Sequence, residues 1–494
     1  MTTNCVPPIT VKCSMPPIGA TIGEELLESD AAVPERTDHA VSHRHGNVAL
    51  RGSVLSVREN GRTGNGRTLG RVSIGRKQSG PGNLSRVNRM RQAVLLSFCD
   101  PLPEQCLELR ALSRRQWEKL MRWLDVSGLA LQFFDRIAEL QQKGLLPAPV
   151  YERLQQNLTD NTARTNDMIT ESIGIQREFQ AANLRYAVLK GVSFWPNSVA
   201  RPELRLQFDL DFLVAEEDLE EARRILAYRG YRLYATTEAC LEFKRNERPG
   251  LTLKDLYRHV GSWMVEVHVE SSVSGSRPVL GRVEWREFYG FRMPVLSPGD
   301  LFLRQGLHAY KHVSHEFTRA AHLVEFRRHV LFRAGDDAFW RELHRSAKDD
   351  EYASIGLGVV ALLISRLMGD FAPDALKSWT VDRLPARCRL WVELYANHVF
   401  LGNAPGSKLY LLLQDRTPHS GTPASRPLWQ YLVPLTVPSP AVRARRDDSL
   451  ATQFARFRML VASTLIRLRF HVVEGLRFLW ESRRWRRHLE RIAS

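Results

Sequence analysis

The chain has 494 residues, enough for two or three domains, and its 44% hydrophobic and 25% charged residues are typical of a soluble globular protein. Its net charge of +16 is concentrated near the two ends, with +9 in residues 35–92 and +8 in residues 441–494 against +2 in residues 93–440. A protein that binds a nucleic-acid backbone needs basic surface beside its working site, so the near-neutral middle argues against nucleic acid as a partner.

Cysteine usage and the apolar stretches indicate the compartment. The six cysteines are scattered without a Cys-x-x-Cys pair, which favours reduced thiols over a disulfide framework or a zinc ribbon. The start of the chain, MTTNCVPPITVKC, has prolines where a secretory signal has its apolar region. The best candidate for a membrane span, Ala353–Ser365, is uncharged for only 13 residues and predicts a buried helix. We therefore expect a cytoplasmic protein.

The first segment, residues 1–92, is rich in Gly, Ser, Arg, Asn and Pro and has little periodicity. This composition predicts a disordered basic tail. Ordered-looking sequence begins at Met90 with MRQAVLLSFCDPLP. A start at Met90, with the upstream part a mis-called extension, is an alternative that the sequence leaves open.

The remaining segments alternate between helical and strand-like patterns. Apolar residues at i, i+3 and i+4 spacing predict a helical region over residues 93–182 and a helical domain over residues 298–402. Between them, residues 183–297 contain a helix that begins with acidic residues and stops at Gly230, and short alternating stretches that predict strands. These stretches are LRYAVL (184–189), FDLDFLV (208–214), YRLY (231–234), WMVEVHVE (263–270) and FRMPVL (291–296).

The last two segments differ in composition. Residues 403–440 are rich in Pro, Gly and Ser and predict a loop-rich segment, and residues 441–494 predict a basic, arginine-laced helix. The expected fold class is therefore α+β, with a small sheet flanked by helical regions on both sides in the sequence.

Two aspartates interrupt the apolar stretch FDLDFLV. Residues two apart in a strand share one face, so Asp209 and Asp211 point the same way, about 7 Å apart along the backbone. Leu210 then points to the core. In WMVEVHVE, Glu266, with His268 and Glu270, lies on one face and three valines on the other. If these two strands are neighbours, three carboxylates converge on one surface of the sheet.

Clustered carboxylates repel one another unless a cation lies between them. Mg²⁺ takes carboxylate and phosphate oxygens as ligands, and two such ions about 3.5–4 Å apart can hold the attacking and leaving oxygens of a phosphoryl transfer. An isolated Asp-x-Asp is more often two solvent-facing acids on an edge strand than a metal site. The order of the surrounding motifs makes the metal interpretation more specific.

These motifs resemble those of a known family. Leu189-Lys190-Gly191 follows the first strand, Arg205 stands four residues before Asp209, the predicted helix ends in Arg-Gly-Tyr, and Val-Glu-Val-His occupies 265–268. This pattern is similar to the uncharacterised bacterial nucleotidyltransferase family of the polymerase-β-like superfamily. The resemblance covers about residues 100–440, including the helical flanks.

The resemblance implies an enzyme whose nucleotidyltransferase core is residues 183–297, an α+β unit with a small mixed β-sheet. It would transfer a nucleoside monophosphate from an NTP to a hydroxyl of a small molecule, a sugar or a protein, with pyrophosphate leaving. Asp209, Asp211 and Glu266 would be the catalytic and metal-binding residues and would hold two Mg²⁺ ions, with Mn²⁺ as the alternative. Glu266 would also help to deprotonate the acceptor hydroxyl, and we favour it over Glu270, which lies further along the strand.

The phosphate contacts are expected on the glycine turn and on Arg205. The wider superfamily has Gly followed by Gly or Ser, whereas Gly191 is followed by valine, with Ser193 next. Lys190 as a point charge and Arg205 as a planar fork are therefore the expected phosphate ligands, together with Gly191 and Ser193. The alternative is that Lys190 and Arg205 form ion pairs with the acidic residues themselves.

A different class of function has to be weighed beside this one. A catalytically silent nucleotidyltransferase fold can serve as a nucleotide-binding or assembly module. The presence of all three acids favours the enzyme. The sequence does not name the acceptor or the preferred base.

Two further features stand outside the motifs. His308, His312 and His315 share one helical face, and His-x-x-x-His is a zinc-type spacing, but no HExxH motif completes it and a packing role is favoured. For His268 we favour a structural role over phosphate contact. The helix predicted at residues 452–492 mixes Arg with Phe, Leu and Trp, and either peripheral membrane contact or packing against a partner fits it; membrane contact is not favoured.

Overall fold

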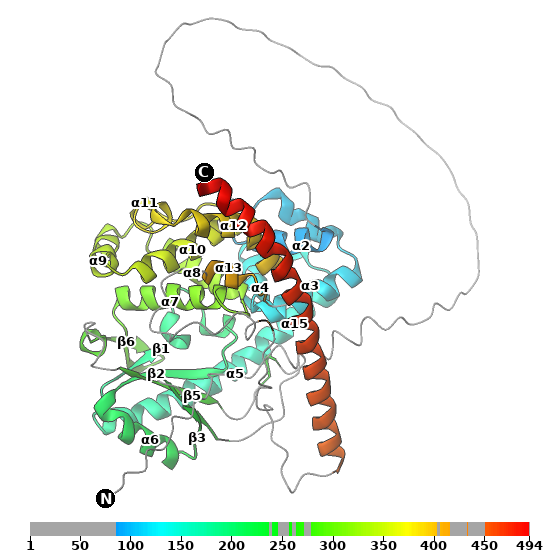
Figure 1. The fold of residues 1–494 in the computed structure, drawn as a ribbon. Coiled ribbons are helices and arrows are strands. Elements are labelled where there is room, and N and C mark those ends of the chain that lie inside the picture. Colours follow the sequence, from blue (N-terminus) through cyan, green and yellow to red (C-terminus); the bar gives the residue numbers. More distant parts are fainter. Residues whose placement is uncertain are drawn as a thin grey trace, which may run out of the picture.

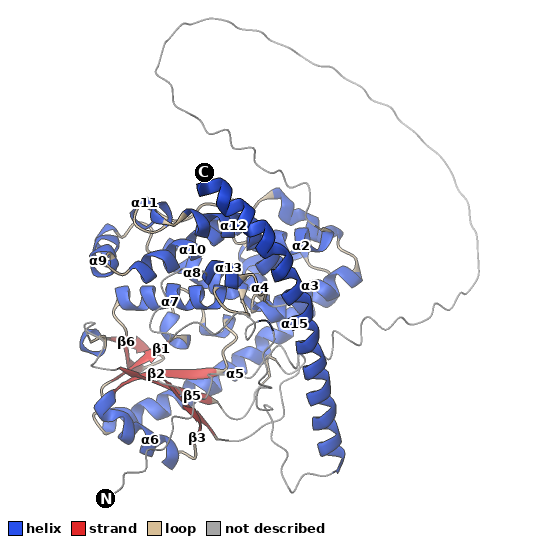
Figure 2. Cartoon of the chain, in the orientation of Figure 1, coloured by secondary structure: helices blue, strands red, loops and turns tan. Residues whose placement is uncertain are grey.

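The computed structural model describes residues 85–236, 240–245, 256–258, 263–270, 278–402, 406–414, 432 and 450–493. These residues form a mixed sheet with helices packed on it, and a larger helical region lies above the sheet in the view of Figures 1 and 2. The arrangement confirms the expected α+β fold class.

The bounds of the helices and strands are as follows. The helices are α2 (Arg86–Leu96), α3 (Arg114–Ser127), α4 (Ala130–Glu139), α5 (Ala148–Ala181), α6 (Leu219–Tyr228), α7 (Pro298–Val313), α8 (Ala320–Phe332), α9 (Asp337–Ala347), α10 (Glu351–Met368), α11 (Asp374–Lys377), α12 (Ala386–Leu401), α13 (Tyr410–Gln414) and α15 (Leu450–Ala493). The strands are β1 (Tyr186–Leu189), β2 (Asp209–Ala215), β3 (Arg232–Thr236), β4 (Cys240–Lys244), β5 (Met264–Glu270), β6 (Glu284–Phe288) and β7 (Phe291–Val295).

The sheet has the strand order β3-β4-β5-β2-β1-β7-β6. Strands β2 and β5 pair in parallel at its centre, and β1 pairs antiparallel with β2 and parallel with β7. All five expected strands are present, but β4 and β6 were not expected from the sequence. Both are short strands at or next to the sheet edge, and their alternation of apolar and charged residues is brief.

The side chains of β2 alternate between two different environments. Leu210, Phe212 and Val214 join the apolar core between the sheet and helices α5 and α6, as the sequence predicted for the first two. Leu213 and Ala215 face the other way and join the core of the helical region. Because Asp209 and Asp211 share the face of Leu213, they lie between the sheet and the helical region rather than on a solvent-facing edge.

Helix α7 lies on the face of the sheet that carries Asp209 and Asp211 and connects the sheet to the helical region. Its start follows the local sequence: the Ser297 hydroxyl accepts a hydrogen bond from the Asp300 amide, and Pro298 occupies the first turn. Helix α10 packs against α7 and contains the apolar stretch expected to be buried. It is the single described helix long and apolar enough to cross a membrane, and 67% of that window is buried inside the protein.

The described residues bear on two of the predicted segments, the N-terminal tail and the loop-rich segment. Residues 1–84 lie outside the described residues, but helix α2 starts at Arg86, so the expected tail of residues 1–92 ends in ordered structure. Met90 lies within α2 and is 5% exposed because the helix packs on α12 and α3. The alternative start at Met90 stays a prediction. The short helix α13 lies in the segment expected to be loop-rich, and most of that segment is outside the described residues.

The C-terminal helix α15 confirms the predicted long helix. Phe478 and Trp485 in its second half are buried on the helical region. Its first half extends away from the rest of the described protein in Figure 1, and side chains such as Phe454 and Phe457 are exposed there. Membrane contact and partner contact therefore both remain predictions for this half of the helix.

Candidate active site

The three predicted acids come together at the centre of the sheet. In the parallel pairing of β2 with β5, Asp211 stands directly opposite Glu266, which confirms that the two strands are neighbours. One carboxylate oxygen each from Asp209, Asp211 and Glu266 lie within 4.8 Å of one another. Asp211 and Glu266 are buried, whereas Asp209 is partly exposed.

Two cations from neighbouring positions contact this acidic cluster. The Lys190 ammonium lies 2.5 Å from Asp211 Oδ1 and 3.4 Å from Glu266 Oε2. His268 Nε2 lies 3.3 Å from the same Asp211 oxygen and 3.5 Å from Glu266. Of the two alternatives for Lys190, the structure therefore shows the ion pair with the acids, and His268 also pairs with them.

The clustered charges stabilise the protonated state of both cations. Burial by itself would lower the pKa of Lys190, but the charges of Asp211, Asp209 and Glu266 together raise it. Burial would likewise lower the pKa of His268, yet its contacts with Asp211, Cys240 and Glu266 raise that pKa well above the usual value.

The three carboxylates are not equivalent. Burial and then the neighbouring Asp211 raise the pKa of Asp209. Burial would also raise the pKa of Glu266, but the hydrogen bond with His268, the charge of Lys190 and the contact with Asp211 together outweigh it, so the pKa of Glu266 is lowered. The raised pKa of Asp209 therefore comes first from loss of hydration and second from the like charge of Asp211.

One carboxylate oxygen lacks a partner. Asp211 Oδ2 is buried and has no hydrogen-bond partner among the residues that the structure describes. A buried unpaired carboxylate oxygen is costly, and a divalent cation with oxygen-ligand preference would satisfy it. The donor set, three carboxylates within 4.8 Å, therefore fits Mg²⁺ or Mn²⁺.

The turn after β1 is shaped by close packing. Lys190 and Gly191 both have φ of +47°, and a Cβ at Gly191 would stand 2.1 Å from the Gln207 side chain. The Ser193 hydroxyl donates to the Lys190 carbonyl at 2.7 Å, and Gln207 donates to the Asp209 carbonyl. Gly191 thus lets the turn approach β2, and Ser193 closes the turn. Phosphate contact by either residue stays a prediction.

Arg205 has a different partner from the one the sequence suggested. Its Nε donates to Glu325 on α8 at 3.1 Å, and its guanidinium stands over the Phe194 ring. Among the described residues, the ion pair of Arg205 is therefore with an acid of the helical region, although its charge also acts to lower the pKa of Asp209. The sequence could not predict Glu325 as the partner, because it lies 120 residues from Arg205.

Two acids on the same sheet face have roles that sequence reasoning did not assign. Glu242 on β4 pairs in register with Glu266, so it extends the row from Asp211 by one strand, and it is 2% exposed. The sequence pattern that could have identified Glu242 is the alternation Leu-Glu-Phe at 241–243. Glu270 instead accepts hydrogen bonds from the Val279 and Leu280 amides, which agrees with the preference for Glu266.

The comparisons with known proteins agree with the predicted resemblance. The model of a family described as uncharacterised nucleotidyltransferase matches residues 113–366, just over half of the chain. The chain belongs to this family. The matched residues include the whole sheet and helices α3 to α9.

Beyond the family, the similarities are weak. The crystal structure of an antigenic nucleotidyltransferase-like protein from Paracoccidioides brasiliensis is similar over 42% of this chain and 93% of that chain, at 14% identity and a TM-score of 0.25. A likeness at this TM-score has no bearing on activity. No curated protein matches the chain.

Proposed function

We propose that this member of the nucleotidyltransferase family is an Mg²⁺-dependent enzyme that transfers a nucleoside monophosphate from an NTP to a hydroxyl. The observation that carries the proposal is the convergence of Asp209, Asp211 and Glu266 on one sheet face, with a buried Asp211 oxygen that lacks a partner among the described residues. A row of carboxylates in this position costs stability unless it serves a cation.

Asp209, Asp211 and Glu266 are the residues that would hold the metal. When bound there, Mg²⁺ would neutralise charge on the triphosphate and on the leaving pyrophosphate. Mn²⁺ would bind the same oxygen donors.

The chain's own residues would position the reactants and accept the proton. The acceptor hydroxyl oxygen forms a bond to the α-phosphorus, the bond from that phosphorus to the oxygen bridging the β-phosphorus breaks, and pyrophosphate leaves with the electron pair. The ionised Glu266 carboxylate, with its lowered pKa, takes the hydroxyl proton. Lys190, which neutralises Asp211 and Glu266 in the absence of substrate, would turn its charge to the triphosphate.

The acceptor belongs to a class with little negative charge. Residues 93–440, which include the sheet and most of the helices, carry a net charge of only +2. A long nucleic-acid template or primer needs a basic surface beside the site, so a small molecule, a sugar or a protein hydroxyl is the proposed acceptor.

The test is a thermal-shift titration of the full chain with each of the four NTPs, with and without Mg²⁺. A ligand that binds only the folded state raises the melting temperature, and binding at 100 times Kd stabilises by about 2.7 kcal/mol. We expect an Mg²⁺-dependent rise for at least one NTP and its loss in Asp209→Asn/Asp211→Asn. A matched control, Glu216→Gln/Glu217→Gln, removes two exposed acids just beyond β2 and should behave as wild type.

A second candidate function has an observation in its favour. Lys190 and His268 already neutralise Asp211 and Glu266 through four contacts of 3.5 Å or less. Such internal neutralisation is also typical of a silent fold that serves as a nucleotide-binding or assembly module. A well-folded protein with no Mg²⁺-dependent shift for any NTP would favour this module over the enzyme.

A further inference from the structure

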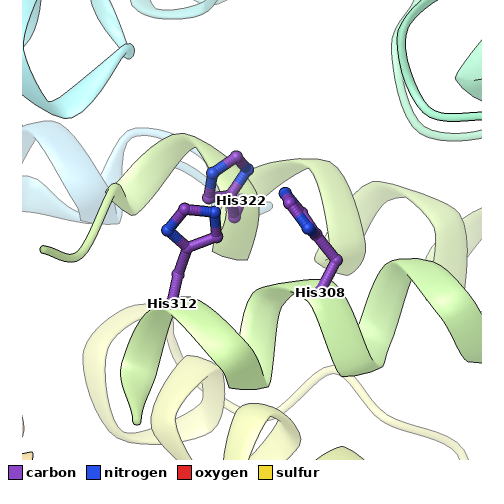
Figure 3. A group of neighbouring side chains, drawn as sticks. All are labelled: His308, His312 and His322. Carbon is purple, nitrogen blue, oxygen red and sulfur yellow. The ribbon is translucent and has the colours of Figure 1, made fainter. Parts of the chain in front are cut away.

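Three histidines from two helices form a cluster beside the sheet site. His308 and His312 lie one turn apart on α7, and His322 lies in the first turn of α8. Figure 3 shows the three rings turned toward one another across the gap between the two helices. One ring nitrogen from each lies within 4.8 Å of the other two, and the ring centroids are 4.4–5.0 Å apart.

The outer contacts of the cluster resemble those of metal-binding histidines. His312 Nδ1 lies 3.3 Å from the Phe317 carbonyl, which can only accept, so Nδ1 carries the proton and Nε2 keeps its lone pair. His322 Nδ1 lies 3.8 Å from Glu325 Oε2. A histidine that binds a metal through one nitrogen usually turns the other toward a carbonyl or a carboxylate, and both kinds of partner are present here.

The three rings are in the state that binds a cation. Burial, reinforced by the neighbouring histidines, lowers the pKa of His308 and of His312 well below the usual value. Burial also lowers the pKa of His322, although Glu325 opposes the shift. Each neutral imidazole has one ring nitrogen with a free lone pair, so the three facing rings can offer three ligand nitrogens to one ion.

Other histidines of the helical region provide a contrast. His329 on α8 is fully buried, and both of its ring nitrogens have protein partners: Nδ1 donates to Gln305 at 2.7 Å, and Nε2 lies 3.5 Å from the Asn197 amide. His315, which the sequence grouped with His308 and His312, instead stacks on Tyr410 and contacts the Lys311 carbonyl. His329 and His315 thus contact groups other than imidazoles, whereas each clustered histidine faces two other imidazoles.

We propose that His308, His312 and His322 form a binding site for a divalent transition-metal ion of the zinc class. Zinc–nitrogen bonds of about 2.0–2.1 Å place tetrahedral nitrogen ligands about 3.4 Å apart, so rotations of the rings that bring the nitrogens together by about 1 Å complete the site. Imidazole ligands favour zinc, cobalt or nickel over Mg²⁺, which prefers oxygen. Three protein ligands leave the fourth position to a water or to a substrate atom.

Glu325 connects this site to the sheet site. It faces His322 with Oε2 and accepts the hydrogen bond of Arg205 with Oε1. A metal on the histidines would hold Glu325 by way of His322 and so fix Arg205, which stands four residues before Asp209. The site does not depend on nucleotidyl transfer, and its metal binding can be measured whether or not the protein has that activity.

The test is a Co²⁺ titration of the full, tag-free chain after treatment with a chelator. Cobalt bound by three imidazoles and water in tetrahedral geometry has strong visible absorption, whereas cobalt on carboxylates in octahedral geometry absorbs weakly. We expect one equivalent of Co²⁺ to give the strong spectrum, and one equivalent of Zn²⁺ to remove it. The spectrum should disappear in His308→Asn/His312→Asn and persist in the control His315→Asn. It should also persist in Asp209→Asn/Asp211→Asn, which separates this site from the sheet site.

A second variant keeps the test decisive if the double variant does not fold. His322→Cys substitutes a thiolate for an imidazole, and direct ligation predicts a new thiolate-to-cobalt charge-transfer band in the near ultraviolet. Absence of that band in a folded His322→Cys protein would overturn the proposal. So would a wild-type chain whose cobalt spectrum and affinity equal those of the double variant.

Discussion

The acidic cluster on the sheet and the histidine cluster on the helices have the same size but opposite chemistry. Each brings three ligand atoms within 4.8 Å of one another. In the acidic cluster, Lys190 and His268 form ion pairs with Asp211 and Glu266. The histidines are neutral because burial lowers their pKa, and no ion pair joins the three rings to one another.

The difference shows how the backbone decides what a cluster can bind. A strand with period two places Asp209 and Asp211 on one face, and the parallel pairing of β2 with β5 adds Glu266 in register, so hard oxygen ligands gather on one sheet face. The histidines depend on the packing of α7 on α8. The two clusters therefore predict different metals, Mg²⁺ at the sheet and zinc at the helices, within one protein.

The largest expected effect is on catalysis at the sheet. Asp211→Asn removes a carboxylate of the proposed metal site and with it several kcal/mol of transition-state stabilisation, on the order of 10³-fold in rate. The measurement is NTP-dependent pyrophosphate release with Mg²⁺. Glu216→Gln, an exposed acid beyond the end of β2, is the control. Equal rates for Asp211→Asn and wild type would refute the role of the acidic cluster.

The next largest effect is on stability, through the ion pairs of Lys190 with Asp211 and Glu266. Lys190→Met leaves Asp211 and Glu266 buried without that cation, which costs about 3 kcal/mol in the free energy of unfolding. Mg²⁺ should restore part of this loss, so the variant should gain more stability from Mg²⁺ than wild type does in urea unfolding.

The control for that experiment is a lysine with exposed partners. Lys377 forms ion pairs with Asp370 and Asp374, whose side chains are 69% and 98% exposed, so Lys377→Met should change stability by no more than about 1 kcal/mol. No difference in Mg²⁺ response between Lys190→Met and wild type would show that the acids do not take up the ion.

A third prediction addresses the packing that brings the histidines together. A Cβ at Gly306 on α7 would stand 2.2 Å from Leu357 on α10 and 2.9 Å from Phe326 on α8. Gly306→Ala should therefore destabilise the protein by about 1–3 kcal/mol in urea unfolding and weaken Co²⁺ binding to the histidines. Gly299→Ala lies on the same helix with no atom within 4 Å of its added Cβ, and it should alter neither quantity.

The smallest effect is on the pH dependence of stability, through His329, which is buried outside the three-histidine cluster. Burial lowers the pKa of His329 to about 3, so below pH 6.5 the unfolded chain takes up a proton that the folded chain does not, and stability falls as the pH falls. Between pH 7.5 and 5.5 the loss is about 1.4 kcal/mol. His329→Gln should lack this contribution, seen as a smaller slope of unfolding free energy against pH. Parallel slopes for the two proteins would contradict it.

The sequence predicted the centre of the site because its signal was local. The alternation around Asp209 and Asp211, and again around Glu266, identified both the strands and the face that carries the acids. The edge and near-edge strands β4 and β6 were missed because each is five residues long, and Glu242 was missed with β4. The ion pair of Arg205 with Glu325 was also missed, since it depends on a helix distant in sequence.

The histidines show both what the sequence predicts and what depends on tertiary structure. Helical periodicity correctly placed His308 and His312 on one face of α7, but it added His315, which turns toward Tyr410 instead. His322 joins them only because α8 packs against α7. By itself the sequence predicted the described strands other than β4 and β6, the long helices and the strand faces that carry Asp209, Asp211 and Glu266, because periodicity of two or 3.6 residues fixes which side chains share a face. The tertiary structure alone decided the ion pairs of Lys190 and Arg205 and the third histidine, because contacts between elements depend on how their faces pack.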